Sequence, residues 1–289
     1  MLSPMDPARL DSELPRVRAF LFDIDGVLLH GSSAVPGAAL ALQHLRELGY
    51  VVAYLTNDNV AGPGPRAELL ASHGYPVQEG SVITAGMVAA QAALAWQGKR
   101  VLVFGSPDLV ARVDAAVGGA LTLSDYIRTA QDIDVLLMGR NDELFDYEHV
   151  ALLARALMRS LNAQFYATNT DRRVPSGPHD FVPGTGAMIR AVEWVADRVA
   201  TPLAKPQQAA AELAVAYLGL APSEVVMVGD QPDADVLMAR RAGLHSVLVL
   251  TGYANPESAE PPQEQRPELV LGSAADLAQL SRRPPSPVD

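Results

Sequence analysis

Short apolar runs alternate with amphipathic stretches along most of this chain. The first run, residues 17–22, is aromatic and branched, which favours a buried strand, and it ends in Asp23-Ile24-Asp25-Gly26. Residues 38–48 then place apolar side chains on one helical face, and a second strand pattern follows over residues 50–55. A strand, a helix and a strand within about 40 residues predict the βαβ unit of a parallel sheet.

The same alternation predicts the later elements. We expect helices over residues 66–72, 85–97, 107–116, 147–160, 185–198, 207–218 and 234–242. We expect strands over residues 100–105, 134–139, 164–169, 224–228 and 246–250, with an edge strand at 269–271. Turn-forming residues are concentrated in segments 61–65 and 171–184, which we expect to be loops.

The composition narrows the class of protein. Of the 289 residues, 49% are apolar and 19% are charged, which suits a well-buried α/β protein. The net charge is −11 and no basic stripe is visible, so we expect no nucleic-acid partner. The absence of cysteine excludes disulfides and thiolate metal sites. No stretch reaches about 18 apolar residues, so we expect no membrane partner and a cytoplasmic protein.

Chemically reactive side chains follow three of the predicted strands. Asp23 and Asp25 follow the first strand, Thr56 and Asn57 follow the second, and Asp230 follows the strand at 224–228. In an open parallel sheet, ligands bind outside the carboxyl ends of the strands. We therefore expect these side chains to meet at one edge of the sheet.

This set of residues suits phosphoryl transfer through an acyl phosphate. Asp23 would attack phosphorus, since a carboxylate can form a covalent intermediate, and Lys205 would pair with Asp23 and with the phosphate. Asp25 would protonate the leaving oxygen and later deprotonate the attacking water. The segment Thr56-Asn57 would bind the phosphoryl oxygens, and Gly26 would let backbone N–H groups approach the anion.

An acidic protein that handles a phosphate needs local positive charge, which a metal ion can supply. Mg²⁺ suits an all-oxygen site with few protein ligands and several waters. Such ligands would come from Asp23, from Asp230 and from the backbone carbonyl of Asp25. Asp233 and Asp235 begin the next predicted helix, where acidic residues also complement the helix dipole.

Four segments, in this order, resemble the motifs of the haloacid dehalogenase (HAD) superfamily of phosphatases: Phe22-Asp23-Ile24-Asp25-Gly26, Leu55-Thr56-Asn57, Lys205-Pro206 and Val228-Gly229-Asp230-Gln231-Pro232-Asp233-Ala234-Asp235. Three more segments are similar to the NagD-like (type IIA) branch, which includes p-nitrophenyl phosphate, phosphoglycolate, glycerol phosphate and pyridoxal phosphate phosphatases: Ala167-Thr168-Asn169-Thr170-Asp171-Arg172, Val182-Pro183-Gly184-Thr185-Gly186-Ala187 and Leu248-Val249-Leu250-Thr251-Gly252. The likeness covers residues 17 to about 281.

The resemblance implies an α/β fold with a Rossmann-like parallel-sheet core and a large inserted α/β cap domain of type C2. It places the core at residues 17–81 and 203–281 and the cap at 82–202, with loose tails at 1–16 and 282–289. It implies a Mg²⁺-dependent phosphomonoesterase acting on a small phosphorylated metabolite, and relatives of this kind often pair as a homodimer through the cap. By the family spacing, Asp235 is a better candidate than Asp233 for supporting the metal.

The branch carries its specificity segment in the predicted loop at 171–184. Arg172 and Arg173 could attract an anionic leaving group or could be exposed charges, and His179 could contact substrate or solvent. We take Arg172 and His179 as the substrate-binding candidates of this loop.

The sequence departs from the branch in three places. Asp58 stands where asparagine is usual, and an extra carboxylate there could repel some substrates or bind a second cation. Gly62-Pro63-Gly64-Pro65 replaces a Ser/Arg-type stretch, which puts a basic substrate contact from this stretch in doubt. Gly139-Arg140-Asn141-Asp142 replaces the usual Gly-Leu-Asp turn of the cap.

Three other functions compete with a phosphatase. A dehalogenase of the same superfamily would use Asp23 but would not need an acid two residues later, so Asp25 argues against it. A receiver-type signalling domain also gathers aspartates, a hydroxyl and a lysine, but lacks a large insertion. The third is a catalytically weak binding or sensing protein, and Asp58 is the residue that would indicate it.

Overall fold

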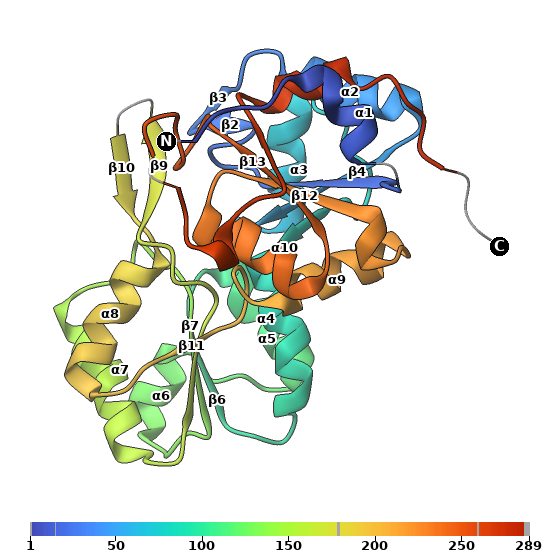
Figure 1. The fold of residues 1–289 in the computed structure, drawn as a ribbon. Helices are drawn as coiled ribbons and strands as arrows, with labels where there is room; N and C mark the ends of the chain where they lie inside the picture. The colour runs from blue at the N-terminus through green and yellow to red at the C-terminus, as the bar shows by residue number, and fades with distance from the viewer. Residues whose placement is uncertain (1, 15, 178–179, 259, 286–289) are drawn as a thin grey trace.

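The computed structural model describes residues 2–14, 16–177, 180–258 and 260–285, and within them the chain forms two parallel sheets covered by helices (Figure 1). The six-stranded sheet, here the core sheet, and the four-stranded second sheet lie at opposite ends of the molecule. The second sheet lies in the inserted region, which we define as residues 85–202.

The core sheet is entirely parallel, with strand order β14-β13-β12-β1-β4-β5. Its strands are β1 (Ala19–Phe22), β4 (Val51–Thr56), β5 (Val82–Thr84), β12 (Val225–Gly229), β13 (His245–Val249) and β14 (Leu269–Leu271). The chain moves outward from β1 through β4 and β5, and later fills the other side of β1. The strand order therefore reverses at β1, and such a reversal is where open parallel sheets bind ligands.

Both faces of the core sheet are buried, which explains why its strands read as continuous apolar runs. Phe20 and Phe22 of β1 pack toward α2 (Ala38–Leu48), whereas Leu21 faces a second cluster with α9 (Gln208–Leu218) and α10 (Leu237–Ala242). The helices of this part are α2, α3 (Pro63–Ser72), α9 and α10. Gly49 ends α2 in the left-handed conformation, as a C-terminal glycine does.

The second sheet is also parallel, with strand order β11-β8-β7-β6. Its strands are β6 (Val101–Phe104), β7 (Val135–Met138), β8 (Gln164–Ala167) and β11 (Thr201–Pro202). The helices around it are α5 (Pro107–Val117), α6 (Leu123–Thr129), α7 (Tyr147–Arg159) and α8 (Thr185–Ala196). Leu136 and Leu137 of β7 belong to different apolar clusters, so this sheet has a core on each face of its own.

Helix α4 (Ala85–Ala93) joins the two parts. Ala85 and Val88 pack in a cluster of the core sheet, whereas Ala89 and Ala93 pack in a cluster of the second sheet. The predicted division into a core and a cap stays a prediction, but its first boundary needs a correction. β5, which the boundary at residue 82 assigns to the cap, pairs with β4 in the core sheet.

The segment predicted as a loop at 171–184 contains an antiparallel hairpin, β9 (Arg173–Gly177) and β10 (Asp180–Pro183). The hairpin reaches from the inserted region to the core beside the small ribbon β2 (Leu29–His30) and β3 (Ser33–Ala34) (Figure 1). His179, a predicted substrate contact, lies outside the described residues.

Two further expectations are wrong. The N-terminal arm is not loose, because Leu10 of α1 (Leu10–Glu13) is fully buried in the core and Asp11 accepts hydrogen bonds from Ser281. Helix α3 begins at Pro63, inside the expected loop, since proline is well tolerated in the first turn of a helix. Among the described residues, the helices are too short or too polar to cross a bilayer.

Candidate active site

A cavity of about 930 Å³ opens at the carboxyl ends of β1, β4 and β12, between the core sheet and the inserted region. Asp23, Thr56 and Asp230 line it from the core. Asp171 and Arg172 line it from the inserted region. Residues far apart in the sequence therefore meet at one place, at the sheet edge that the strand pattern indicates.

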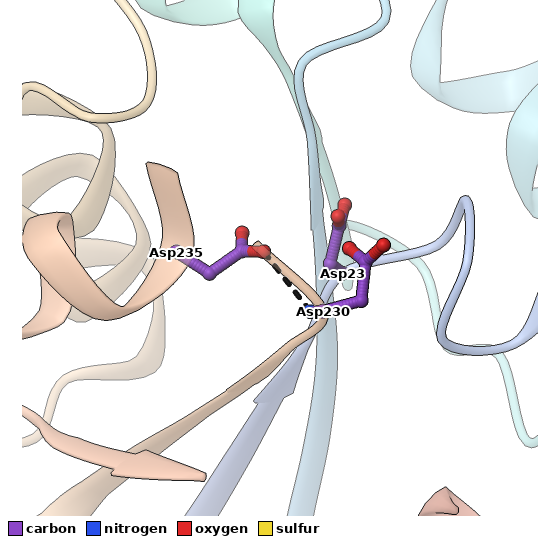
Figure 2. Close-up of side chains that lie close together, drawn as sticks. All are labelled: Asp23, Asp230 and Asp235. Carbon is purple, nitrogen blue, oxygen red and sulfur yellow. Dashed lines mark hydrogen bonds between the residues drawn. The ribbon is translucent and has the colours of Figure 1, made fainter. Parts of the chain in front are cut away.

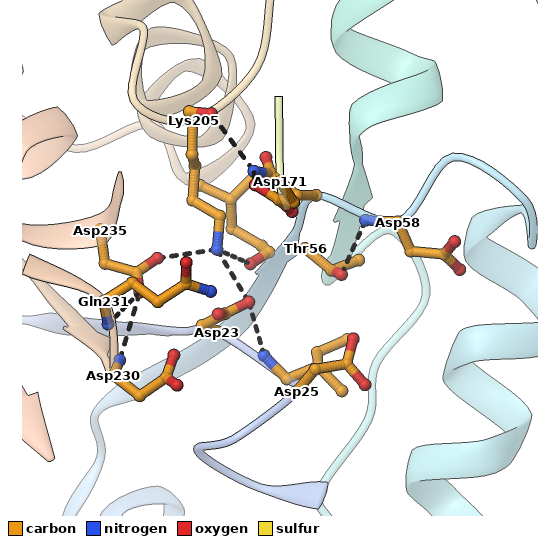
Figure 3. A network of polar contacts seen from close by, with 12 residues as sticks. Asp23, Asp25, Thr56, Asp58, Asp171, Lys205, Asp230, Gln231 and Asp235 are labelled. Carbon is orange, nitrogen blue, oxygen red and sulfur yellow. Dashed lines mark hydrogen bonds and ion pairs between the residues drawn. The ribbon is translucent and has the colours of Figure 1, made fainter. Parts of the chain in front are cut away.

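Lys205 lies at the centre of the polar network at the base of the cavity (Figure 3). Its Nζ is 2.8 Å from Asp23 Oδ1 and 2.7 Å from Asp235 Oδ1, and it donates a hydrogen bond of 3.3 Å to the carbonyl of Leu55. Burial alone would lower the pKa of Lys205, but the carboxylates of Asp23 and Asp235 outweigh burial and raise that pKa above its ordinary value. The ammonium therefore stays charged.

Three buried carboxylates, those of Asp23, Asp230 and Asp235, offer oxygen atoms that lie within 4.8 Å of one another (Figure 2). Burial and the neighbouring carboxylate of Asp235 raise the pKa of Asp230 to about 7. Burial likewise raises the pKa of Asp23 well above its ordinary value, against the opposing charge of Lys205. The cluster holds more negative charge than one ammonium balances, which is the condition that favours a bound cation.

The hydrogen bonds divide these carboxylates into two kinds. Both oxygens of Asp235 are in use, because Oδ1 faces Lys205 while Oδ2 accepts from the backbone N–H groups of Asp230 at 3.2 Å and Gln231 at 3.1 Å. Asp230 Oδ2 accepts from the N–H of Tyr253 at 2.5 Å, but its buried Oδ1 has no hydrogen-bond partner among the described residues. Asp230 therefore keeps an oxygen atom that could bind a cation, whereas both oxygens of Asp235 hold Lys205 and the loop after β12.

Two glycines let the backbone pack closely around Asp230. A Cβ at Gly26, where φ is +88°, would lie 2.4 Å from Asp230 Oδ2, and one at Gly252 would lie 2.1 Å from the same atom. Thr251 Oγ1 also donates to the carbonyl of Gly26 at 2.8 Å. Glycine is therefore required at position 26 because a side chain there would collide with the Asp230 carboxylate. The sequence suggests another reason, that Gly26 lets backbone N–H groups approach an anion.

Asp25 lies beside the cluster on the cavity wall and is not one of its three carboxylates. Burial raises the pKa of Asp25, while the guanidinium of Arg66, whose NH1 is 3.9 Å from Asp25 Oδ1, opposes that rise. A carboxyl group with a raised pKa holds its proton to a higher pH than an ordinary aspartate does, which is the direction that a general acid needs. The predicted contact of its backbone carbonyl with a metal stays a prediction.

Thr56 and Asn57, predicted together as phosphate ligands, are used differently. Thr56 is buried at the cavity, and its Oγ1 accepts from the N–H of Asp58 at 3.0 Å, so the hydroxyl proton is free to donate. The amide of Asn57 instead donates to Asp171 Oδ1 at 2.9 Å and to the carbonyl of Lys205 at 3.2 Å. Burial raises the pKa of Asp171, despite this bond, to about 6. The Asn57 side chain thus links the core to the inserted region.

Four arginines of the inserted region line the cavity: Arg140, Arg172, Arg173 and Arg190. Arg172, the predicted candidate, is an exposed lining residue. The guanidinium of Arg173 lies 5.4 Å from the ring centre of Phe181 and 5.6 Å from that of Tyr253, a cation–π arrangement across the two parts of the chain. The sequence pattern did not indicate Tyr253, although it directly follows the quoted segment ending in Gly252.

Comparison with known proteins agrees with this geometry. The haloacid dehalogenase-like hydrolase family matches residues 20–117, and the HAD-hydrolase-like family matches residues 202–277. A glycerol-3-phosphate phosphatase of Gallus gallus is 31% identical over 93% of this chain and 95% of its own length. The ribonucleotide monophosphatase NagD of Escherichia coli is 27% identical over 90% of this chain and 98% of its own length.

A solved structure has the same fold. The p-nitrophenyl phosphatase from Archaeoglobus fulgidus superposes with a TM-score of 0.78 at 27% identity, over 92% of this chain and 99% of that one. The parallel-sheet α/β fold expected from the sequence is thereby confirmed, as is the resemblance drawn from the motifs. This chain belongs to the haloacid dehalogenase-like hydrolases, among the NagD-like phosphatases that act on phosphoric monoesters.

Proposed function

We propose that this enzyme is a Mg²⁺-dependent phosphomonoesterase that hydrolyses a small phosphorylated metabolite through an aspartyl-phosphate on Asp23. The observation that carries the proposal is the buried cluster in which Lys205 holds Asp23 and Asp235 while Asp230 Oδ1 has no partner among the described residues. The cluster opens into a cavity large enough for a small metabolite.

The positions of the side chains support the following order of bond changes. Asp23 Oδ1 accepts from Lys205 and from the N–H of Ile24 at 2.8 Å, and both contacts orient the carboxylate for attack. A bond forms between Asp23 and phosphorus as the ester bond breaks, and Asp25 gives its proton to the leaving oxygen. Asp25 then takes a proton from water, which attacks phosphorus, and the bond to Asp23 breaks to release phosphate.

Asp23 and Asp230, with the backbone carbonyl of Asp25, would hold the metal ion. The fit rests on the excess of buried carboxylates and on the unpartnered Asp230 Oδ1. Bound there, Mg²⁺ would withdraw charge from the phosphoryl oxygens during transfer. Lys205 contributes positive charge beside Asp23, and the Thr56 hydroxyl can donate to a phosphoryl oxygen.

The alternative of a weak binding or sensing protein loses its main support. It depended on Asp58 as an uncompensated carboxylate near the phosphate, but Asp58 Oδ2 accepts from Arg66 Nε at 2.7 Å. A dehalogenase is disfavoured because Asp25 lies at the cavity beside the cluster, where dehalogenation needs no acid. Two of the relatives, the glycerol-3-phosphate phosphatase of Gallus gallus and the ribonucleotide monophosphatase NagD of Escherichia coli, are named as phosphatases.

Replacement of Asp23 by asparagine tests the nucleophile. We expect Asp23→Asn to reduce hydrolysis of 4-nitrophenyl phosphate by about 10³-fold or more, since the amide cannot form the acyl phosphate. The circular dichroism spectrum should stay unchanged, because the two side chains have nearly the same shape. Turnover at the wild-type rate would reject the mechanism.

Replacement of Asp25 by asparagine separates proton transfer from metal binding. We expect Asp25→Asn to slow turnover by about 10²- to 10⁴-fold, because it removes the general acid. Mg²⁺ binding measured by calorimetry should persist, since the predicted ligand at this position is the backbone carbonyl. An unchanged turnover rate would show that Asp25 is not the general acid and base.

Metal removal tests the proposed cofactor by activity and by stability. EDTA should abolish turnover and Mg²⁺ should restore it. Mg²⁺ should also raise the melting temperature of the wild type, because it binds the folded carboxylate cluster and relieves its repulsion. Asp230→Asn should lose most of this thermal shift. Full activity in EDTA, or an equal thermal shift in Asp230→Asn, would contradict the site.

We further propose a homodimer that forms through the inserted region, which takes the place of the predicted cap. Trp194 of α8 is 89% exposed and Val199 just beyond it is 75% exposed, and such apolar exposure often marks an interface. A molecular mass in solution twice that of one chain is expected, and the mass of a single chain would reject the dimer. A cytoplasmic location and the lack of nucleic-acid and membrane partners stay predictions.

A further inference from the structure

Arg66 and Asp58 form an ion pair on the cavity wall that the mechanism above does not use. Arg66, on α3, lines the cavity and donates from Nε to Asp58 Oδ2 at 2.7 Å. Its NH1 is 3.9 Å from Asp25 Oδ1. The side chains of Arg66 and Asp58 are 17% and 9% exposed, so the pair is held mostly out of solvent.

Asp58 is fixed by the backbone as well as by Arg66. Its Oδ1 accepts from the N–H of Val60 at 2.9 Å, and its Oδ2 accepts from the N–H of Ala61 at 3.3 Å. The Asp58 carboxylate points away from Lys205 and Asp23 (Figure 3). It is therefore poorly placed to bind a second cation. Its effect is to hold Arg66 by Nε, which leaves the two terminal nitrogens of the guanidinium for other partners.

This pair accounts for two departures of the sequence from its branch. Asp58 replaces the usual asparagine, and the Gly62–Pro65 stretch lacks the usual basic side chain. Because α3 begins at Pro63, Arg66 lies in the first turn of the helix and its side chain reaches the cavity. A positive charge is thus present on this wall, although it comes from a later position in the chain.

Four other arginines line the cavity, all from the inserted region, and three of them have partners of their own. Arg140 makes a two-pronged pair with Asp142, through contacts of 2.6 Å each. Arg190 pairs with Glu193, and Arg173 lies between two aromatic rings. Arg66 is the arginine whose guanidinium lies within 4.0 Å of Asp25 among the described residues.

We propose that Arg66 determines specificity by binding a carboxylate on the leaving group, next to the ester oxygen. The inference rests on the proposed function, in which Asp25 protonates that oxygen. A guanidinium 3.9 Å from Asp25 then lies beside the first carbon of the leaving group. The planar fork of arginine matches a carboxylate with two parallel hydrogen bonds. Asp58 is a positioning residue, which acts by holding Arg66.

The test compares substrates that differ at this carbon. The carbon bonded to the ester oxygen carries a carboxylate in 2-phosphoglycolate and a neutral chain in glycerol 3-phosphate, whereas 4-nitrophenyl phosphate has an aromatic ring there. For Arg66→Gln, we expect kcat/KM for 2-phosphoglycolate to fall about 10- to 100-fold more than for the other two, mainly through KM. Arg66→Lys should restore only part of the loss, because lysine lacks the fork.

Asp58→Asn tests the positioning role. Asparagine keeps an acceptor for Arg66 Nε but removes the charge, so KM for 2-phosphoglycolate should rise less than in Arg66→Gln, with kcat little changed. The double variant should be no worse than Arg66→Gln alone, because both changes act through one guanidinium. Arg128→Gln is the matched control, since Arg128 also pairs with an aspartate, at 2.8 Å, but its side chain is 76% exposed and does not line the cavity.

The outcomes separate this inference from the proposed function. An equal fall for all three substrates would show that Arg66 acts on the phosphate or on Asp25 and would overturn the inference, while the phosphatase mechanism stands. No change in Arg66→Gln, or a selective loss in Arg172→Gln instead, would also overturn it. A wild-type enzyme that hydrolyses none of the three esters would reject the proposed function itself. Thermal unfolding of each variant shows whether it is folded.

Discussion

The site depends on one buried lysine. Lys205 Nζ has three protons and three acceptors, which are Asp23, Asp235 and the carbonyl of Leu55. A buried charge is costly unless it is paired and hydrogen-bonded, and a pair whose partners are all satisfied avoids most of that cost. Asp23 directly follows β1, Leu55 is the residue before the last one of β4, and Asp235 lies shortly after β12. A single ammonium therefore fixes the carboxyl ends of these three neighbouring strands relative to one another.

The same interaction also fixes the path of the chain. Lys205 lies three residues after β11, where the chain leaves the inserted region and returns to the core. Its backbone carbonyl accepts from the Asn57 amide, which also donates to Asp171. Electrostatic pairing and hydrogen bonding therefore connect the return segment, the end of β4 and the inserted region within a few ångströms of the proposed nucleophile. The proposed chemistry and the enclosure of the cavity therefore depend on the same residues, since Lys205 contacts Asp23 and also, through Asn57, connects the core to the inserted region.

Much of the site could be predicted from the sequence because a parallel sheet brings the ends of its strands to one edge. An apolar run followed at once by Asp23, Thr56 or Asp230 gives both the strand and the direction in which its polar end points. Prediction was weaker where the deciding contact is tertiary. Nothing local to Asn57 shows that its amide is taken by Asp171, more than a hundred residues later.

The elements that were missed have related causes. The β9–β10 hairpin contains prolines and glycines that favour a loop locally, and its strands are defined only by their pairing. Leu10 has no periodic apolar pattern around it, yet it is buried because it packs into the apolar cluster formed by residues of β1 and α2. Asp58 was visible as a departure, but its partner eight residues later was not. A helix was expected from Arg66 onward, yet no local pattern shows that α3 starts at Pro63 or that the Arg66 side chain turns back to Asp58.

Tyr253 connects the enclosure of the cavity to the proposed metal site. Its N–H donates to Asp230 Oδ2, and this bond occupies one oxygen of the proposed metal ligand and leaves Oδ1 as the atom without a partner among the described residues. The ring of the same residue faces the guanidinium of Arg173 from the hairpin. A shift of the hairpin would therefore act on Tyr253, and through its N–H on the orientation of Asp230. The backbones of Gly26 and Gly252 pack closely against the Asp230 side chain, so this carboxylate has little freedom to turn in another direction. The inserted region and Asp230, the proposed metal ligand, are thus held in one arrangement by packing as well as by charge.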